Sequence, residues 1–306
     1  MDRNSSLQRR LLTILAGLVV LLGTSGLVAT AASADTDPTG PAQNNFAAAF
    51  LYSEQNPTAV PPGANDWTCR PGAAHPRPVV LVHGTFENRY DNWAELSPQL
   101  KAAGYCVYAL NYGGSDGSVF QGTNEIAASA GQLATFVDQV LAATGASKVD
   151  LVGHSQGGMM PRYYLKNLGG AAKVANLVAL VPSNHGTTLD GIADLAVEFP
   201  VLGVLVGIPC QACTEQIQGS TFVTALNSGG ETSSSVKYTV ISTTHDEVVT
   251  PYTSAFLAAG SNVTNETVQD FCPSDSTEHV GIAYDTPALQ LVRNALDPAH
   301  ATAPTC

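Results

Sequence analysis

The chain has 306 residues, of which 44% are hydrophobic and only 12% are charged. This balance is typical of a globular protein that buries a large core, and it excludes a disordered chain. The formal net charge of −12 argues against nucleic acid and anionic lipid headgroups as binding partners.

Residues 1–34 predict a secretory signal peptide. Three arginines precede an apolar run over residues 11–28, and the small residues Ala32-Ser33-Ala34 stand before Asp35. Cleavage there leaves 10 basic against 24 acidic residues, a formal charge of −14. We therefore expect a secreted protein without a stable membrane span. The Arg9-Arg10 pair leaves twin-arginine export open, and an uncleaved membrane anchor is the alternative, because the apolar run is nearly long enough to cross a bilayer.

Six apolar runs predict strands, and helical stretches alternate with them. The strands are expected over residues 78–82, 106–110, 149–152, 174–181, 236–242 and 267–271. The helices are expected over residues 45–52, 91–103, 123–143 with Thr123 as the cap, from the residues after Ser155 to 168, and over 286–296. The strands lack alternation of apolar and polar residues, which is typical of a parallel sheet covered on both faces. Residues 35–306 are therefore predicted to form one α/β domain.

Residues 189–230 depart from this alternation. The segment is too apolar for a solvated loop, yet prolines and glycines between residues 200 and 209 interrupt it too often for one long helix. It is interpreted either as a pair of core helices or as a cap-like insertion that supplies an apolar pocket. Because it follows the carboxyl end of a strand, both interpretations place it beside a ligand site.

The cysteine count predicts a disulfide framework. All six cysteines follow residue 34, and an even number in an exported chain indicates three disulfides. Pairing of sequence neighbours is the preferred connectivity: Cys69–Cys106, Cys210–Cys213 and Cys272–Cys306. A metal site at the third and fourth cysteines is the alternative, but a second pair with the same spacing is missing from the sequence.

The motif with the clearest chemistry is Gly153-His154-Ser155-Gln156-Gly157-Gly158, which follows an apolar strand and opens a helix. A serine between glycines at such a sharp turn is held exposed above the sheet, because bulkier neighbours would clash. A glycine-rich turn without chemistry is the alternative. The strand before the motif and the second glycine after it favour a nucleophilic Ser155.

A serine nucleophile needs a base, and the base needs an acid that holds it in one tautomer. In the α/β-hydrolase arrangement the acid and then the histidine follow the serine, on loops after later strands. Asp246 follows the strand over 236–242 and is the expected acid, while His279 is the expected base and His300, in the C-terminal tail, is disfavoured. Other candidate acids are Glu247, Asp190 and Asp194.

The tetrahedral intermediate of acyl transfer needs backbone N–H donors for its oxyanion. Gln156, directly after the nucleophile, is expected to supply one at a helix N-terminus. The loop after the first strand is expected to supply the other through Thr85, with Phe86 as the alternative. Three further histidines follow strand ends and are expected to line the site or to support its loops: His83, His154 and His185. No metal is expected among them, because a serine mechanism needs none.

These motifs together resemble secreted bacterial lipases of the α/β-hydrolase fold, and most of all the actinobacterial triacylglycerol lipases of class 2. The residues that carry the resemblance are Val82-His83-Gly84-Thr85, 153–158, 242–246 and Glu278-His279, and the likeness covers about residues 45–296. It implies hydrolysis of carboxylic esters with medium or long acyl chains, a lipid or other hydrophobic ester as substrate, no cofactor, and the triad Ser155, Asp246 and His279. Some bacterial lipases also bind a structural calcium ion, but this sequence has no clustered acidic loop that would carry it over.

Two other functions are compatible with the same residues. A polyester depolymerase or an acyltransferase of the cell envelope would use the same triad, because pocket shape and water exclusion decide the acceptor. A non-catalytic binding protein of this fold is a remote alternative, since all three triad members are present. The cap-like insertion over 189–230 is then the expected acyl pocket.

Overall fold

The protein is built around a parallel β-sheet. A computed structural model describes residues 37–197 and 209–306, so the predicted signal peptide and part of the 189–230 segment lie outside the described residues. The strands are β1 (Val79–Val82), β2 (Val107–Leu110), β3 (Val149–His154), β4 (Val174–Leu180), β5 (Lys237–Ser242) and β6 (Val263–Thr267).

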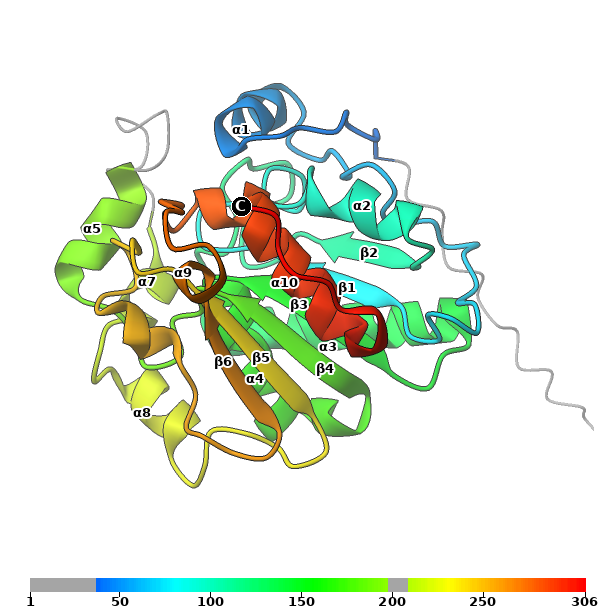
Figure 1. Cartoon of the computed structure of the whole chain (residues 1–306). Coiled ribbons are helices and arrows are strands. Elements are labelled where there is room, and N and C mark those ends of the chain that lie inside the picture. Colours follow the sequence, from blue (N-terminus) through cyan, green and yellow to red (C-terminus); the bar gives the residue numbers. More distant parts are fainter. Residues whose placement is uncertain (1–36, 198–208) are drawn as a thin grey trace, which may run out of the picture. The chain divides into compact units, whose positions relative to one another are not determined.

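The α-helices of the described residues connect these strands (Figure 1). They are α1 (Phe46–Gln55), α2 (Leu96–Ala102), α3 (Ile126–Thr144), α4 (Gln156–Asn167), α5 (Leu189–Val197), α7 (Gln211–Glu215), α8 (Thr221–Asn227), α9 (Val268–Phe271) and α10 (Thr286–Leu296). All described residues belong to one compact unit.

The six strands form one sheet in the order β2-β1-β3-β4-β5-β6, and every neighbouring pair is parallel. Parallel strands direct all their carboxyl ends to one edge, so the loops after β1, β3, β5 and β6 emerge on the same side. The predicted α/β class with a parallel sheet is confirmed.

Helices cover both faces of the sheet. Alternate side chains of each strand point to opposite faces, so Val80 and Val82 pack with α3 and α4 while Val79 and Leu81 pack with α2 and α10. Strands β1, β2 and β3 are fully buried, although β2 lies at one edge of the sheet, and this burial explains their uninterrupted apolar sequences. By length and composition α3 is the one described helix that could cross a membrane, yet its apolar residues, among them Leu133 and Val137, pack in the core.

The last strand and the helix after β1 differ from the prediction. The strand expected over 267–271 is β6 at Val263–Thr267, followed by the short helix α9. β6 lies at the sheet edge and exposes Thr264 and Asn265, so its sequence lacks the apolar run of a central strand. The helix expected over 91–103 is shorter, because the side chains of Asp91 and Asn92 accept bonds from loop N–H groups at Asn88 and Gly84.

The predicted cap of the next helix is also wrong. Thr123 donates its hydroxyl to the carbonyl of Gly113, and α3 begins three residues later. The first N–H of the helix, at Ile126, is bound by the side chain of Glu215 on α7 at 2.7 Å. A residue distant in sequence therefore takes the place of a local cap.

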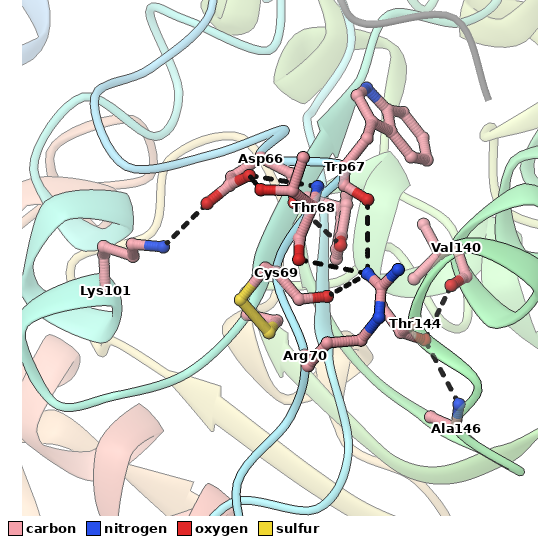
Figure 2. The surroundings of a disulfide bond; sticks show 11 residues. Asp66, Trp67, Thr68, Cys69, Arg70, Lys101, Val140, Thr144 and Ala146 are labelled. Atoms are coloured by element: carbon pink, nitrogen blue, oxygen red, sulfur yellow. Dashed lines mark hydrogen bonds and ion pairs between the residues drawn. A yellow bond between two sulfur atoms is a disulfide. The ribbon is translucent and has the colours of Figure 1, made fainter. Parts of the chain in front are cut away.

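Three disulfides cross-link the described part of the chain: Cys69–Cys106, Cys210–Cys213 and Cys272–Cys306. Figure 2 shows the first of them, which joins the loop around Thr68 to the residue before β2. The guanidinium of Arg70 donates to the carbonyls of Thr68 and Cys69 in the same loop. Trp67 packs its ring 5.1 Å from that of Tyr108 on β2. The disulfide thus closes a loop that also packs against the sheet.

Candidate active site

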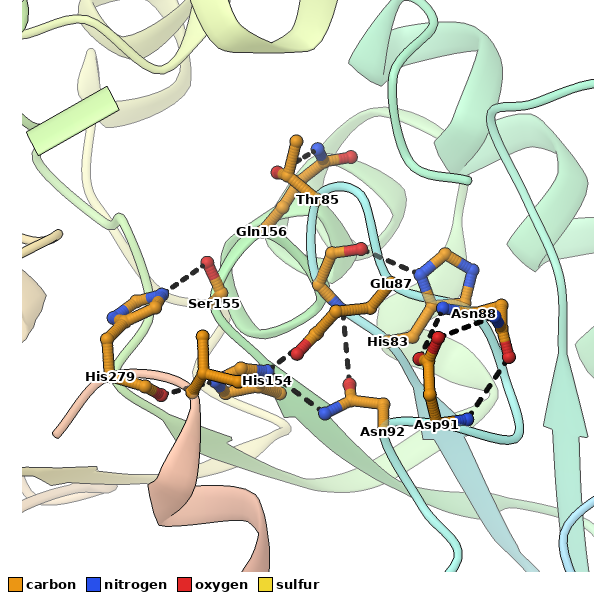
Figure 3. A network of polar contacts seen from close by, with 12 residues as sticks. His83, Thr85, Glu87, Asn88, Asp91, Asn92, His154, Ser155, Gln156 and His279 are labelled. Carbon is orange, nitrogen blue, oxygen red and sulfur yellow. Dashed lines mark hydrogen bonds and ion pairs between the residues drawn. The ribbon is translucent and has the colours of Figure 1, made fainter. Parts of the chain in front are cut away.

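Ser155 lies on the turn between β3 and α4, at the carboxyl edge of the sheet (Figure 3). Its backbone has φ 52° and ψ −123°, a conformation that costs a residue with a side chain about 1–3 kcal/mol. The neighbouring glycines make the turn possible. A Cβ on Gly157 would lie 2.1 Å from the carbonyl oxygen of Val82, and one on Gly153 would lie 1.9 Å from that of Gly157.

The structure brings His279 between Ser155 and Asp246. The His279 Nε2 atom lies 3.0 Å from Ser155 Oγ, and its Nδ1 lies 3.0 and 3.1 Å from the two carboxyl oxygens of Asp246. A carboxylate only accepts hydrogen bonds, so Nδ1 carries the ring proton and Nε2 presents a lone pair to the hydroxyl. The N–H groups of Val248 and Val249 donate to Asp246 Oδ1 and fix the carboxylate.

None of the other candidate acids, Glu247, Asp190 and the half-buried Asp194, has a described hydrogen bond to His279. Glu247 and Asp190 are exposed, and the exposed His300 bonds to Asp297. Asp246 and His279 are buried, as is Ser155, which is 3% exposed. The arrangement can therefore transfer a proton between serine and histidine in a site sheltered from water.

The backbone N–H groups of Gln156 and Thr85 have no acceptor among the contacts of the described residues. Gln156 is the first residue of α4, where the N–H has no acceptor within the helix. Among the described contacts no acceptor is bound to the N–H of Thr85, whereas the N–H of Phe86 donates to the carbonyl of Gln121. Thr85 is therefore better suited than Phe86 to supply the second donor.

Gln216, directly after α7, is a residue that the sequence analysis missed. Its amide nitrogen donates to Thr85 Oγ1 at 3.0 Å, and its amide oxygen accepts from Ser183. The side chain of Gln156 also donates to Thr85 Oγ1, at 2.8 Å. The 189–230 segment thus holds the loop that carries the candidate oxyanion donor. No local motif around Gln216 indicates this, because its partner lies 131 positions away.

Two of the three additional histidines support loops. Burial lowers the pKa of His83 to about 4, so its ring is neutral, and its two nitrogens bond the carbonyl of Gly84 and the N–H of Tyr112. His185 pairs with Glu231 at 2.9 Å and is partly exposed. His154 lies next to the serine, with its ring nitrogens facing Glu87 and the carbonyl of His279.

An apolar cluster joins the loops of the site to the 189–230 segment. Phe86, Val248 and Val280, each within two residues of a candidate site residue, pack together with Leu195 of α5. The cluster also contains Phe46, Phe50, Phe120 and Cys213. The part of the segment that the structure describes therefore forms helices that contact the site, as both interpretations of it required.

No group of three or more histidine, cysteine or acidic side chains in residues 37–197 and 209–306 is arranged to hold a metal ion. Ser155 Oγ bonds His279 Nε2, and the side chain of the following Gln156 bonds Thr85 in the loop after β1. These groups suit nucleophilic attack by a serine and binding of an oxyanion.

The parallel sheet and the helices on its two faces have the α/β-hydrolase fold. The fold matches that of Aspergillus fumigatus lipase B with a TM-score of 0.62 at 22% identity, over 80% of this chain and 56% of that one. It also matches a mature Bacillus licheniformis lipase with a TM-score of 0.56 at 17% identity, over 74% of this chain and 94% of that one.

The sequence model of the family "Lipase (class 2)" matches residues 76–292, and the chain belongs to this family. Triacylglycerol lipases of Pseudarthrobacter phenanthrenivorans and Burkholderia plantarii are each 42% identical over 114 residues, 36% of this chain and 32% and 29% of theirs. A triacylglycerol lipase of Vibrio cholerae is 35% identical over 166 residues, 50% of this chain and 46% of that protein. The match spans less than half the length of each of these curated relatives.

Proposed function

We propose that the protein is a secreted carboxylic ester hydrolase that acts on lipid esters through a covalent acyl-enzyme. In this mechanism Ser155 Oγ attacks the ester carbonyl carbon and its proton passes to His279 Nε2. The carbonyl oxygen becomes an oxyanion that accepts from the N–H groups of Thr85 and Gln156. Such donors typically lower the barrier by about 3–4 kcal/mol each.

The intermediate then breaks its bond to the alcohol oxygen, which leaves with the proton held by His279. Water attacks the acyl-enzyme, gives a proton to the same Nε2, and the carboxylic acid departs as Ser155 regains its proton. Asp246 holds the imidazole and stabilises its charged form. The observation that carries the proposal is the pair of 3.0 Å contacts from His279, one to the serine hydroxyl and one to the carboxylate.

The apolar cluster beside the site supports the proposed class of substrate. Phe86, Val248 and Val280 supply an apolar wall next to the proposed oxyanion donor, acid and base, and Leu195 brings α5 to it. An acyl chain bound there would remove apolar surface from water, at about 0.8 kcal/mol per methylene. Because Ser155 is 3% exposed, we propose that an emulsified ester gains access when helix α5, which carries Leu195, moves away from the site.

Secretion is supported by the N-terminal sequence and by the three disulfides, which persist in oxidising compartments. We expect the protein in the culture medium to begin near Asp35. Recovery of the full-length chain in the membrane fraction would instead support the uncleaved anchor.

The test is hydrolysis of p-nitrophenyl esters and of emulsified triglyceride by the wild type and by Ser155→Ala. We expect the wild type to release product, with a rise in rate once the ester exceeds its solubility limit, and the variant to lose at least about a thousandfold in kcat. Undiminished turnover by folded Ser155→Ala would refute the mechanism. Faster action on an aliphatic polyester film, or acyl transfer to an added alcohol in place of hydrolysis, would favour the polyester or acyltransferase alternative.

A further inference from the structure

A buried histidine and a buried glutamate lie behind the proposed triad without belonging to it (Figure 3). His154, the last residue of β3, and Glu87, in the loop after β1, are each 1% exposed. The distance between His154 Nδ1 and Glu87 Oε2 is 2.8 Å. Charged side chains this deeply buried are retained when they are paired and hydrogen-bonded.

Both ring nitrogens of His154 face oxygen atoms. Nε2 lies 2.8 Å from the backbone carbonyl oxygen of His279, which can only accept, so Nε2 carries a proton. Nδ1 has Glu87 Oε2 at 2.8 Å and the amide nitrogen of Asn92 at 3.1 Å. The shorter contact is to a carboxylate, which places a second proton on Nδ1. Burial disfavours this charge, yet Glu87 and the His279 carbonyl raise the pKa of His154 above its usual value.

The same carboxylate oxygen holds the oxyanion loop. Glu87 Oε2 accepts from the N–H of Gly84 at 2.8 Å, and the side chain of Asn92 accepts from the same N–H at 3.1 Å. A Cβ on Gly84 would lie 2.3 Å from Glu87 Oε2, so a side chain at this position would displace the carboxylate. Thr85, the candidate oxyanion donor, follows directly.

We infer that Glu87 and His154 are positioning residues, and that their ion pair fixes the loops of the oxyanion donor, the nucleophile and the base relative to one another. Glu87 binds the residue before Thr85, His154 precedes Ser155 in the chain, and its ring binds the backbone of His279. This inference rests on the proposed function, because it assigns these loops to one reaction.

The inferred effect is on kcat. Neither side chain contacts the substrate in the proposed mechanism, so its loss changes the placement of other groups. A displacement of about 1 Å in a reacting group can cost about a hundredfold in rate. The affinity for the acyl chain depends on the apolar cluster and changes little.

The kinetic test uses His154→Ala, His154→Gln, Glu87→Ala and the double alanine variant, on a soluble short-chain ester. We expect His154→Ala to lower kcat about a hundredfold with KM within about twofold, and the double variant to lose no more than the worse single one, because the two residues act as a unit. His154→Gln keeps an amide donor near the Nε2 position and should recover at least about tenfold.

The matched control is His185→Ala, which removes a second described His–Glu pair, of similar length at 2.9 Å, and should leave kcat within about twofold. Circular dichroism melting establishes which variants are folded, and the glutamine variant serves if the alanine variant is not. A folded His154→Ala with wild-type kcat, a loss confined to KM, or losses that multiply in the double variant would each refute the inference.

A spectroscopic test reads the charge directly. In the nitrogen-15 spectrum of the histidine side chains we expect both ring nitrogens of His154 to be protonated from about pH 6 to 8, and one of them to lose its proton in Glu87→Gln. A singly protonated ring in the wild type would overturn the ion pair. This result is independent of the proposed function, which Ser155→Ala tests: retained activity there sinks the mechanism even if His154 is charged.

Discussion

The histidine at position 279 takes its tautomer from one carboxylate. Asp246 accepts from His279 Nδ1 and is itself held by the N–H groups of Val248 and Val249. An amide at position 246 could donate to Nδ1 and move the ring proton to Nε2, where it would face the serine hydroxyl. The base would then be unable to take the serine proton.

Asp246→Asn is therefore expected to lower kcat on a soluble ester by about a thousandfold to ten-thousandfold, with little change in the melting temperature. The matched control is Glu247→Gln, because Glu247 is adjacent in the chain, carries the same charge and is exposed. We expect the control to keep kcat within about twofold. Equal losses in the two variants would show that the acid assignment is wrong.

Among single residues, the sequence identifies those that the fold places at strand ends in a fixed order along the chain. Ser155, Asp246 and His279 follow strand ends in the order that the fold requires, and the structure brings them together. Glu87 and Gln216 could not be found in this way. Their contacts cross 67 positions to His154 and 131 positions to Thr85, and neither residue stands in a motif.

The helices and strands differ in how well their bounds can be predicted from local sequence, because tertiary contacts determine some of these bounds. The buried strands and α10, expected over 286–296 and observed over Thr286–Leu296, are predicted well because their apolar patterns match one packed face. The edge strand β6 is polar, and α3 begins at a residue bound by a distant glutamate, so both were misplaced in the sequence analysis. A solvent-exposed edge strand such as β6 and a cap supplied by a distant residue leave little local signal, whereas the buried edge strand β2 is predicted from its apolar run.

The cap of α10 gives a prediction on stability. Asp285 accepts from the N–H of Ala288 at 2.8 Å, and burial together with the nearby Asp275 raises its pKa from 3.8 to about 6. A raised folded pKa contributes stability below the unfolded value of 3.8, and this contribution is lost as the pH rises through about 6.

Asp285→Asn keeps a cap acceptor and removes the charge. We expect the free energy of unfolding of the variant, relative to the wild type, to improve by about 1 kcal/mol between pH 4 and 7, a figure reduced for solvent screening. Urea unfolding at the two pH values measures it. A difference that is constant with pH would contradict the assignment of the shift to Asp285.

At the scale of the whole molecule, the disulfides are expected to differ in how much they stabilise the fold. Cys69–Cys106 joins residues 37 positions apart, whereas Cys210–Cys213 joins residues 3 apart. A cross-link stabilises mainly by restricting the unfolded chain, and the restriction grows with the loop that it closes. We therefore expect Cys69–Cys106, which closes the longer loop, to contribute more to stability than Cys210–Cys213.

Replacing both cysteines by serine should lower the free energy of unfolding by about 3–4 kcal/mol for Cys69–Cys106 and by less than about 2 kcal/mol for Cys210–Cys213. Guanidinium unfolding of the oxidised proteins compares them. A larger loss for Cys210–Cys213 would indicate that this disulfide acts mainly through the native structure around α7 and not by restricting the unfolded chain.

The fold class follows from apolar periodicity over the whole chain, whereas the apolar cluster beside the site does not. The cluster of Phe86, Val248, Val280 and Leu195 is assembled from four separate segments. The sequence of each segment alone indicates only that its apolar residues are buried. Sequence patterns record which residues are buried, but not which buried residues face one another across a site.

The central claim is that Ser155 is a nucleophile activated by His279. The most direct measurement is reaction of the folded wild-type protein with a fluorophosphonate probe, followed by mass spectrometry of the digested chain. We expect one adduct, on the peptide that carries Ser155, and at least about a hundredfold slower labelling in His279→Ala. An unlabelled Ser155 in active, folded protein, or equally fast labelling without His279, would contradict the claim.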